Sequence, residues 1–111
     1  MVAGPYRSGA ASAAECQANL DRLNKIALGI FEKGHTPVIG VNLALPVIRV
    51  AGVPRYEEIM MPLSLRLADR CDGVIRAPGI SAGADLEVER IRAAGGRVFR
   101  DIDEIPSVAA S

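Results

Sequence analysis

The chain has 111 residues, of which 50% are hydrophobic and only 4% aromatic, and its 13 basic residues balance 13 acidic ones. This length and composition predict one globular domain over residues 1–111, and the balanced charge argues against a nucleic-acid or membrane partner. Cys16 and Cys71 lie far apart, in neither a CxxC nor a zinc-binding spacing, so we expect no metal site and no cofactor. No signal peptide or membrane-spanning run is recognisable, and we expect a cytoplasmic protein.

The first forty residues predict a strand, a helix and a second strand. Residues 1–3 begin a short apolar strand that a Gly-Pro pair ends. Ser12 and Glu15 have the spacing of a capping box, and the helix that follows ends at Gly34. Residues 36–41 are predicted to form the second strand. A strand, a helix and a strand of these lengths form a right-handed parallel βαβ unit.

The middle of the chain alternates between irregular and periodic stretches. Residues 42–55 contain two prolines and a glycine among apolar residues, and we expect a long loop that is either a lid over a site or an oligomer contact. Residues 56–70 have helical spacing, with Pro62 expected to kink the helix or to mark its true start. A third strand is predicted around residues 74–77.

The last third predicts a loop over residues 78–81, a helix over 82–94 that a Gly-Gly pair ends, and a strand over 97–100. Residues 103–106 predict a turn, and residues 107–111 are expected to fray. The alternation of strands and helices predicts a three-layer α/β sandwich with a mainly parallel sheet of four or five strands.

Two loops are expected to face one crevice at the carboxyl ends of the strands, where open α/β sheets bind ligands. The loop over residues 4–9 carries Arg7, and Ser81 opens the helix that carries Glu87. A helix N-terminus attracts anions and is expected to lower the pKa of Glu87. Each residue also has a structural interpretation: Ser81 as an N-cap, Glu87 as a helix acid and Arg7 as a solvated charge.

The chain resembles the nucleoside 2-deoxyribosyltransferase superfamily, which includes the nucleoside 5′-monophosphate N-glycosidases. The similarity is greatest to small members with an AGPY-type start and an S-x-G-A-x-x-E helix. It covers nearly the whole chain and rests on three segments in order: Gly4-Pro5-Tyr6-Arg7-Ser8-Gly9, Cys71-Asp72-Gly73-Val74-Ile75 and Ser81-x-Gly83-x-x-x-Glu87.

This resemblance implies a Rossmann-like, flavodoxin-related fold, a homodimer or higher homo-oligomer, and a nucleoside or nucleotide as substrate. It implies that Glu87 attacks C1′ of the sugar and forms a glycosyl-enzyme, which water or a second base then resolves. Tyr6 is expected beside this nucleophile. The remaining site residues are expected to bind the substrate, mostly its 5′-phosphate: Gly4, Arg7, Ser8, Gly9, Ser81, Gly83 and Asp85.

One position departs from the glycosidase pattern. Those enzymes place an aspartate about two dozen residues before the nucleophile, where it assists proton transfer to the leaving base. Counting back from Glu87 leads to Leu63 or Ser64 instead. An alternative to the glycosidase is therefore a module that binds or senses a nucleotide or nucleotide-sugar without turnover. A third alternative is a structural subunit whose 42–55 segment packs on a partner.

Overall fold

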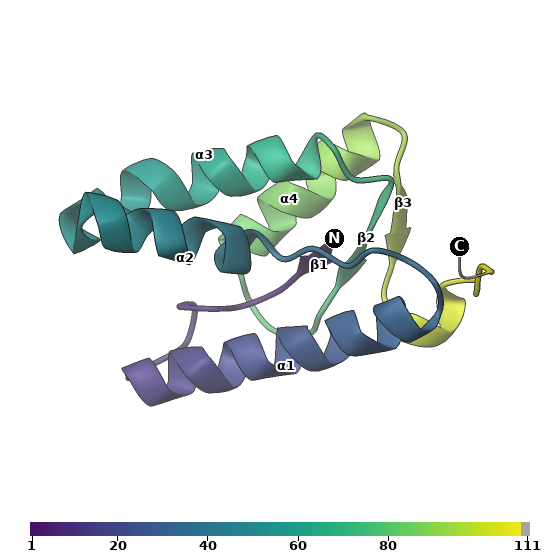
Figure 1. The fold of residues 1–111 in the computed structure, drawn as a ribbon, viewed down its shortest axis with the longest axis horizontal. Coiled ribbons are helices and arrows are strands. Elements are labelled where there is room, and N and C mark those ends of the chain that lie inside the picture. The colour runs from purple at the N-terminus through teal and green to yellow at the C-terminus, as the bar shows by residue number, and fades with distance from the viewer. Residues whose placement is uncertain (110–111) are drawn as a thin grey trace.

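The computed structural model describes residues 1–109 and is a mixed α/β fold with a small parallel sheet (Figure 1). The elements are, in order, β1 (Val2–Ala3), α1 (Ala13–Glu32), α2 (Gly40–Ala51), a 3-10 turn η1 (Val53–Arg55), α3 (Tyr56–Ala68), β2 (Gly73–Arg76), α4 (Ala82–Ala93), β3 (Arg97–Phe99) and a 3-10 turn η2 (Ile102–Glu104).

The sheet has three strands in the order β1-β2-β3, each parallel to its neighbour. The predicted second strand, over residues 36–41, is wrong: Gly40 already begins α2. The residues before it run extended beside β1, where the N–H of Val2 donates to the C=O of Val38 at 2.8 Å. Pro37 cannot donate a ladder hydrogen bond, which weakens pairing there. The expected sheet of four or five strands is therefore not found among residues 1–109.

Helix α1 has the predicted bounds because both of its ends are specified locally. The Ser12 hydroxyl accepts a hydrogen bond from the N–H of Glu15 at 3.2 Å, and the Glu15 carboxylate accepts one from the N–H of Ala11. At the other end, Gly34 adopts a left-handed φ of 94°, which suits a glycine after a helix. The buried side chains Leu20, Leu23 and Ile30 share the inward face.

Helix α2 occupies most of the segment that was predicted to be a loop, so that prediction is wrong. Gly40, Ala44 and Ile48 are spaced four apart and are buried along one stripe. Ala44 and Ile48 form a small hydrophobic cluster with Met60 of α3. This packing stabilises a helix despite an internal proline, and the helix ends only at Gly52, which has a φ of 104°. Helix α3 begins at Tyr56 and continues through Pro62.

Alternate side chains along the strands enter two hydrophobic clusters. Val2 and Ile75 join the cluster that contains Leu20, Leu23 and Ile30 of α1. Ala3 and Val74 join the cluster with buried side chains of α4 (Ala84, Val88 and Ile91). Figure 1 shows α1 on one side of the strands and α4 with α3 on the other. This packing brings the start of α4 to the carboxyl ends of β1 and β2.

The end of the described chain returns to α1. The N–H of Val108 donates to the C=O of Lys33 at 2.7 Å, so the expected fraying from residue 107 is wrong at this position. Residues 110–111 lie outside the described part of the chain. Within residues 1–109, none of the helices has both the length and the apolar character needed to cross a bilayer.

Candidate active site

A cavity of about 210 Å³ lies where the two predicted loops meet the starts of α2, α3 and α4. The predicted site residues that line it are Gly4, Tyr6, Arg7, Ser8, Ser81, Gly83 and Glu87. Two predicted site residues, Gly9 and Asp85, are not among its lining. Typical ligand pockets have roughly 300–1,000 Å³, so a nucleotide would extend out of this cavity into solvent. A larger cavity, of about 530 Å³, contains none of the predicted site residues and lies at the opposite end of the sheet.

Glu87 projects from α4 into the cavity and is only 8% exposed. Within residues 1–109 its carboxylate has no hydrogen-bond or ion-pair partner. Burial raises the pKa of Glu87 to about 7, against the weaker effect of the amino group of Met1 and of Arg76. The expected lowering of this pKa is wrong because the helix dipole acts mainly within the first turn, whereas loss of water acts directly on the carboxylate.

Ser81 is the N-cap of α4, as its structural interpretation proposed. Its hydroxyl accepts a hydrogen bond from the N–H of Ala84 at 3.1 Å, and the residue is only 6% exposed. A serine hydroxyl that accepts one hydrogen bond still has its own proton to donate. Ser81 therefore caps the helix and keeps a donor available to an anion in the cavity.

Arg76, which the sequence did not single out, holds the loop before α4. It is 8% exposed, and its guanidinium donates to the C=O of Gly79 at 2.9 Å and to the C=O of Ser81 at 3.4 Å. The same group pairs with the Asp85 carboxylate at 3.1 Å, which accounts for Asp85 outside the cavity. The sequence signal that could have identified Arg76 is an arginine at the end of an apolar strand. Such an arginine is expected to be buried, and buried arginines are usually paired.

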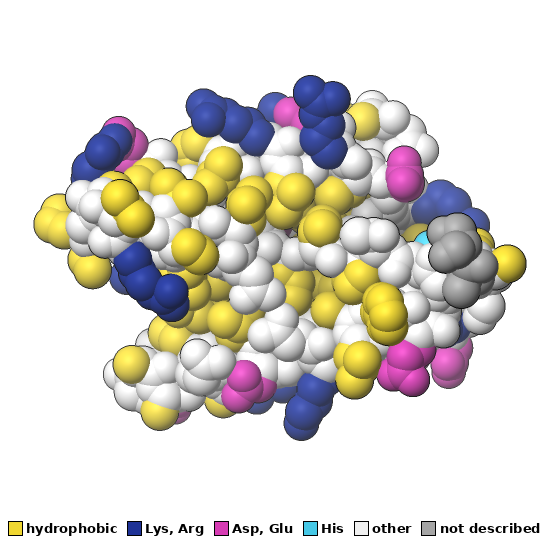
Figure 2. Space-filling view, viewed as in Figure 1, with side chains coloured by type: hydrophobic (Ala, Val, Ile, Leu, Met, Phe, Trp, Pro, Cys, Tyr) yellow, Lys and Arg dark blue, Asp and Glu magenta, His cyan; other side chains and the backbone are white. Residues whose placement is uncertain are grey.

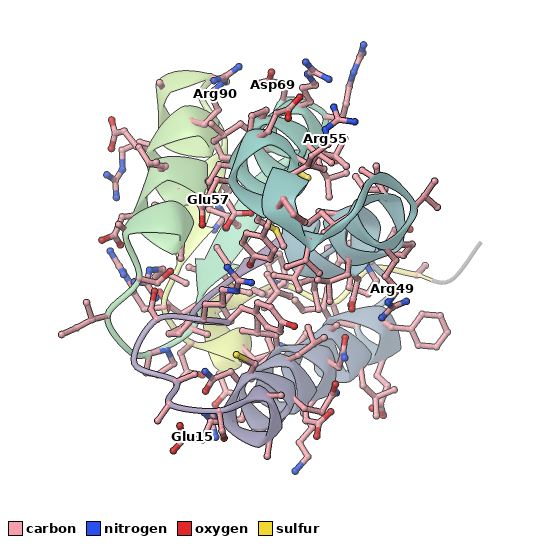
Figure 3. The ribbon with its side chains drawn as sticks, turned by 90° about the vertical axis from the view of Figure 1, so that its left-hand side faces the viewer. Glu15, Arg49, Arg55, Glu57, Asp69 and Arg90 are labelled. Atoms are coloured by element: carbon pink, nitrogen blue, oxygen red, sulfur yellow. The ribbon has the colours of Figure 1, made fainter. Side chains whose placement is uncertain are left out.

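Arg7 lies at the mouth of the cavity and is fixed by α3. Its guanidinium carbon stands 3.4 Å from the centroid of the Tyr56 ring, and a guanidinium nitrogen lies 3.8 Å from a carboxylate oxygen of Glu57. Figure 3 shows Glu57 at the start of α3, on the side that faces α4. Tyr6 is half-buried against the α1 cluster, and its C=O accepts a hydrogen bond from the Asn19 side chain at 2.8 Å. Both tyrosines of the chain thus line the same cavity.

Ser64 is a further cavity residue, and it lies beside Glu87. It is 3% exposed, and within residues 1–109 its hydroxyl has only a weak sulfur partner, Met60 Sδ, at 3.8 Å. A Cβ on Gly40 would stand 2.9 Å from Glu87 Oε2 and closer still to Ser64 Oγ, so glycine is needed where α2 begins. The signal in the sequence was the count back from Glu87, which leads to Leu63 or Ser64.

A cluster of three or more metal-ligating side chains is not found in the part of the chain that the structure describes. Comparisons with protein-family models, with curated proteins and with solved structures gave no match. The candidate function therefore rests on the geometry of the cavity and on the resemblance of its motifs.

Proposed function

We propose that this protein cleaves the N-glycosidic bond of a nucleoside or nucleoside 5′-monophosphate through a glycosyl ester on Glu87. The observation that supports this proposal is the common location of Glu87, Arg7 and Ser81 around one cavity, although 80 residues of sequence separate Arg7 from Glu87. A carboxylate with no partner can act as the nucleophile on the sugar, and nearby hydrogen-bond donors can bind the phosphate; a glycosidase that acts on nucleotides needs both.

In the proposed mechanism the ionised Glu87 carboxylate attacks C1′ while the bond from C1′ to the base breaks. A carboxylate suits this role because it stabilises the oxocarbenium-like transition state and forms an ester that water can hydrolyse. Arg7, Ser8 and Ser81 bind the 5′-phosphate at the mouth, together with the free N–H groups of α4. Tyr6 lines the cavity near the sugar. Gly4 and Gly83 complete the lining, and their lack of a side chain leaves room for Leu23, Ala77 and Met61.

A panel of nucleoside 5′-monophosphates, read by chromatography for free base, tests this proposal. We expect release from one or more members by the native protein and by a Glu89→Gln variant, whose substituted side chain is 65% exposed on the same helix. Glu87→Gln keeps the shape of the side chain but removes the nucleophile, so release should be lost. Turnover that persists in Glu87→Gln would exclude Glu87 as the nucleophile.

The alternative is a nucleotide-binding or sensing module that uses the same cavity without turnover. The specific observation in its favour is that Ser64 lies beside Glu87, because a serine hydroxyl is a poor proton donor; Ser64 is one of the two positions reached by counting back to the aspartate of the glycosidases. A thermal shift with a nucleotide, with no base released from any member of the panel, would support this alternative.

We further propose a homodimer or higher homo-oligomer in the cytoplasm, with the three-layer architecture of the resembled superfamily. Hydrophobic side chains gather over α2 and η1, with Leu43, Val47, Val50 and Val53 between 42% and 91% exposed (Figure 2). An exposed apolar face of this kind is typical of a protein contact. Light scattering on the native protein and on Val50→Glu tests it: the substitution should yield monomers, and a native monomer would refute the oligomer.

A further inference from the structure

The cavity lining contains two carboxylates, and neither is placed to protonate a leaving base. Glu87 must be ionised to attack the sugar. The side chain of Glu57 is 89% exposed and lies 3.8 Å from Arg7, at the mouth. The buried hydroxyl of Ser64 is far too weak an acid for this role. A base that leaves from this cavity must therefore depart without receiving a proton from these groups.

The walls around Glu87 favour a positive charge. The residue is 8% exposed, and among residues 1–109 its carboxylate has no hydrogen-bond or ion-pair partner, so a cation that enters the cavity would stabilise its charged form. Two tyrosine rings line the same space, and aromatic faces attract cations, as the position of Arg7 over Tyr56 already illustrates. At the mouth, Arg7 offers donors to an anion beside the exposed carboxylate of Glu57, and the buried hydroxyl of Ser81 offers one more donor from the cavity lining.

From these observations, and resting on the proposed glycosidase function, we propose that the substrate is a cationic N-glycoside 5′-monophosphate, with a pyridinium or N-alkylated purinium base. Glu87 bonds to C1′ as the bond from C1′ to the ring nitrogen breaks. The electron pair of that bond neutralises the nitrogen, so the base leaves neutral and needs no proton. Water then opens the ester at C1′ and releases one proton to solvent, which regenerates the carboxylate.

The test compares nicotinamide mononucleotide, whose pyridinium ring carries a permanent positive charge, with its 1,4-dihydro form, whose ring is neutral and of nearly the same size; guanosine 5′-monophosphate is a second ligand with a neutral base. At pH 8 we expect kcat/KM for the cation to exceed those for the neutral ligands by about 10²- to 10⁴-fold, the usual contribution of a general acid, a role that neither carboxylate of this cavity is placed to fill. Comparable kcat/KM values for the neutral and cationic ligands would overturn this inference but would still support the proposed glycosidase function.

Equilibrium binding separates the failure of this inference from the failure of the proposed function. The native protein and Glu89→Gln should bind the cation at least about tenfold more tightly than its dihydro form, and Glu87→Gln should lose this preference. The same preference without release of any base would refute the glycosidase and keep the cationic ligand class. Equal affinities for both forms would overturn the inference irrespective of turnover.

Discussion

Replacing Glu87 by glutamine should change how the stability of the protein depends on pH. Burial raises the pKa of Glu87 from 4.5 to about 7, so between these pH values the folded protein holds a proton that the unfolded chain has lost. The stabilisation from this proton is fully present below pH 4.5 and is lost as the pH rises through about 7. The interval between 4.5 and about 7, at about 1.4 kcal/mol per pH unit, amounts to about 3 kcal/mol.

Urea unfolding of the native protein, Glu87→Gln and Glu89→Gln between pH 4.5 and pH 8 measures this effect. Glutamine has the shape of the protonated acid and does not ionise, so Glu87→Gln should gain about 3 kcal/mol relative to the native protein over this range. Glu89→Gln should follow the native curve because its substituted side chain is largely exposed. Parallel curves for the native protein and Glu87→Gln would show that burial does not raise the pKa of Glu87 and would refute the reasoning.

Four further predictions concern stability, binding and turnover. Leu23→Ala should lower the free energy of unfolding by about 2–5 kcal/mol, because Leu23 is 2% exposed between α1 and the sheet; a loss below about 1 kcal/mol would contradict this packing. Gly40→Ala should cost about 1–3 kcal/mol and reduce base release, because its Cβ would collide with Ser64 and Glu87; unchanged stability and release would be inconsistent with this contact. Arg7→Ala should weaken nucleoside monophosphates, but not nucleosides, by about 1.5–3 kcal/mol in calorimetry; an equal loss for both would move the phosphate site elsewhere. Finally, kcat/KM for base release should rise about tenfold per pH unit up to about pH 7 and then level off, since Glu87 must ionise to attack; a flat profile from pH 5 to pH 8 would argue against it.

The sequence alone specifies the elements whose ends depend on neighbouring residues. Helix α1 was predicted with nearly its observed bounds because Ser12 and Gly34 form its caps through contacts within a few residues. Helix α4 was predicted equally well, from Ser81 at its start and Gly95 after its end. The two loops that form the cavity were also predicted, because parallel strands of alternating α/β order bring their carboxyl ends to one edge.

Tertiary packing decided the rest. The apolar residues of α2 were interpreted as a loop because Pro46 and Gly52 are local breakers, whereas packing of Ala44 and Ile48 on Met60 stabilises a helix. Local contacts cannot reveal that partner, which lies more than ten residues away in the sequence.

The properties of Glu87 depend on the same kind of distant contact. Its position in α4 predicted a lowered pKa, but enclosure by the residues around the cavity raises it. The place of Tyr56 in the cavity and of Arg76 behind the loop before α4 emerged only in the structure, since their chemistry depends on which distant side chains face them. Caps and periodicity are properties of short segments and can be read from the sequence, whereas burial and its effect on a charge arise only when the whole chain has folded.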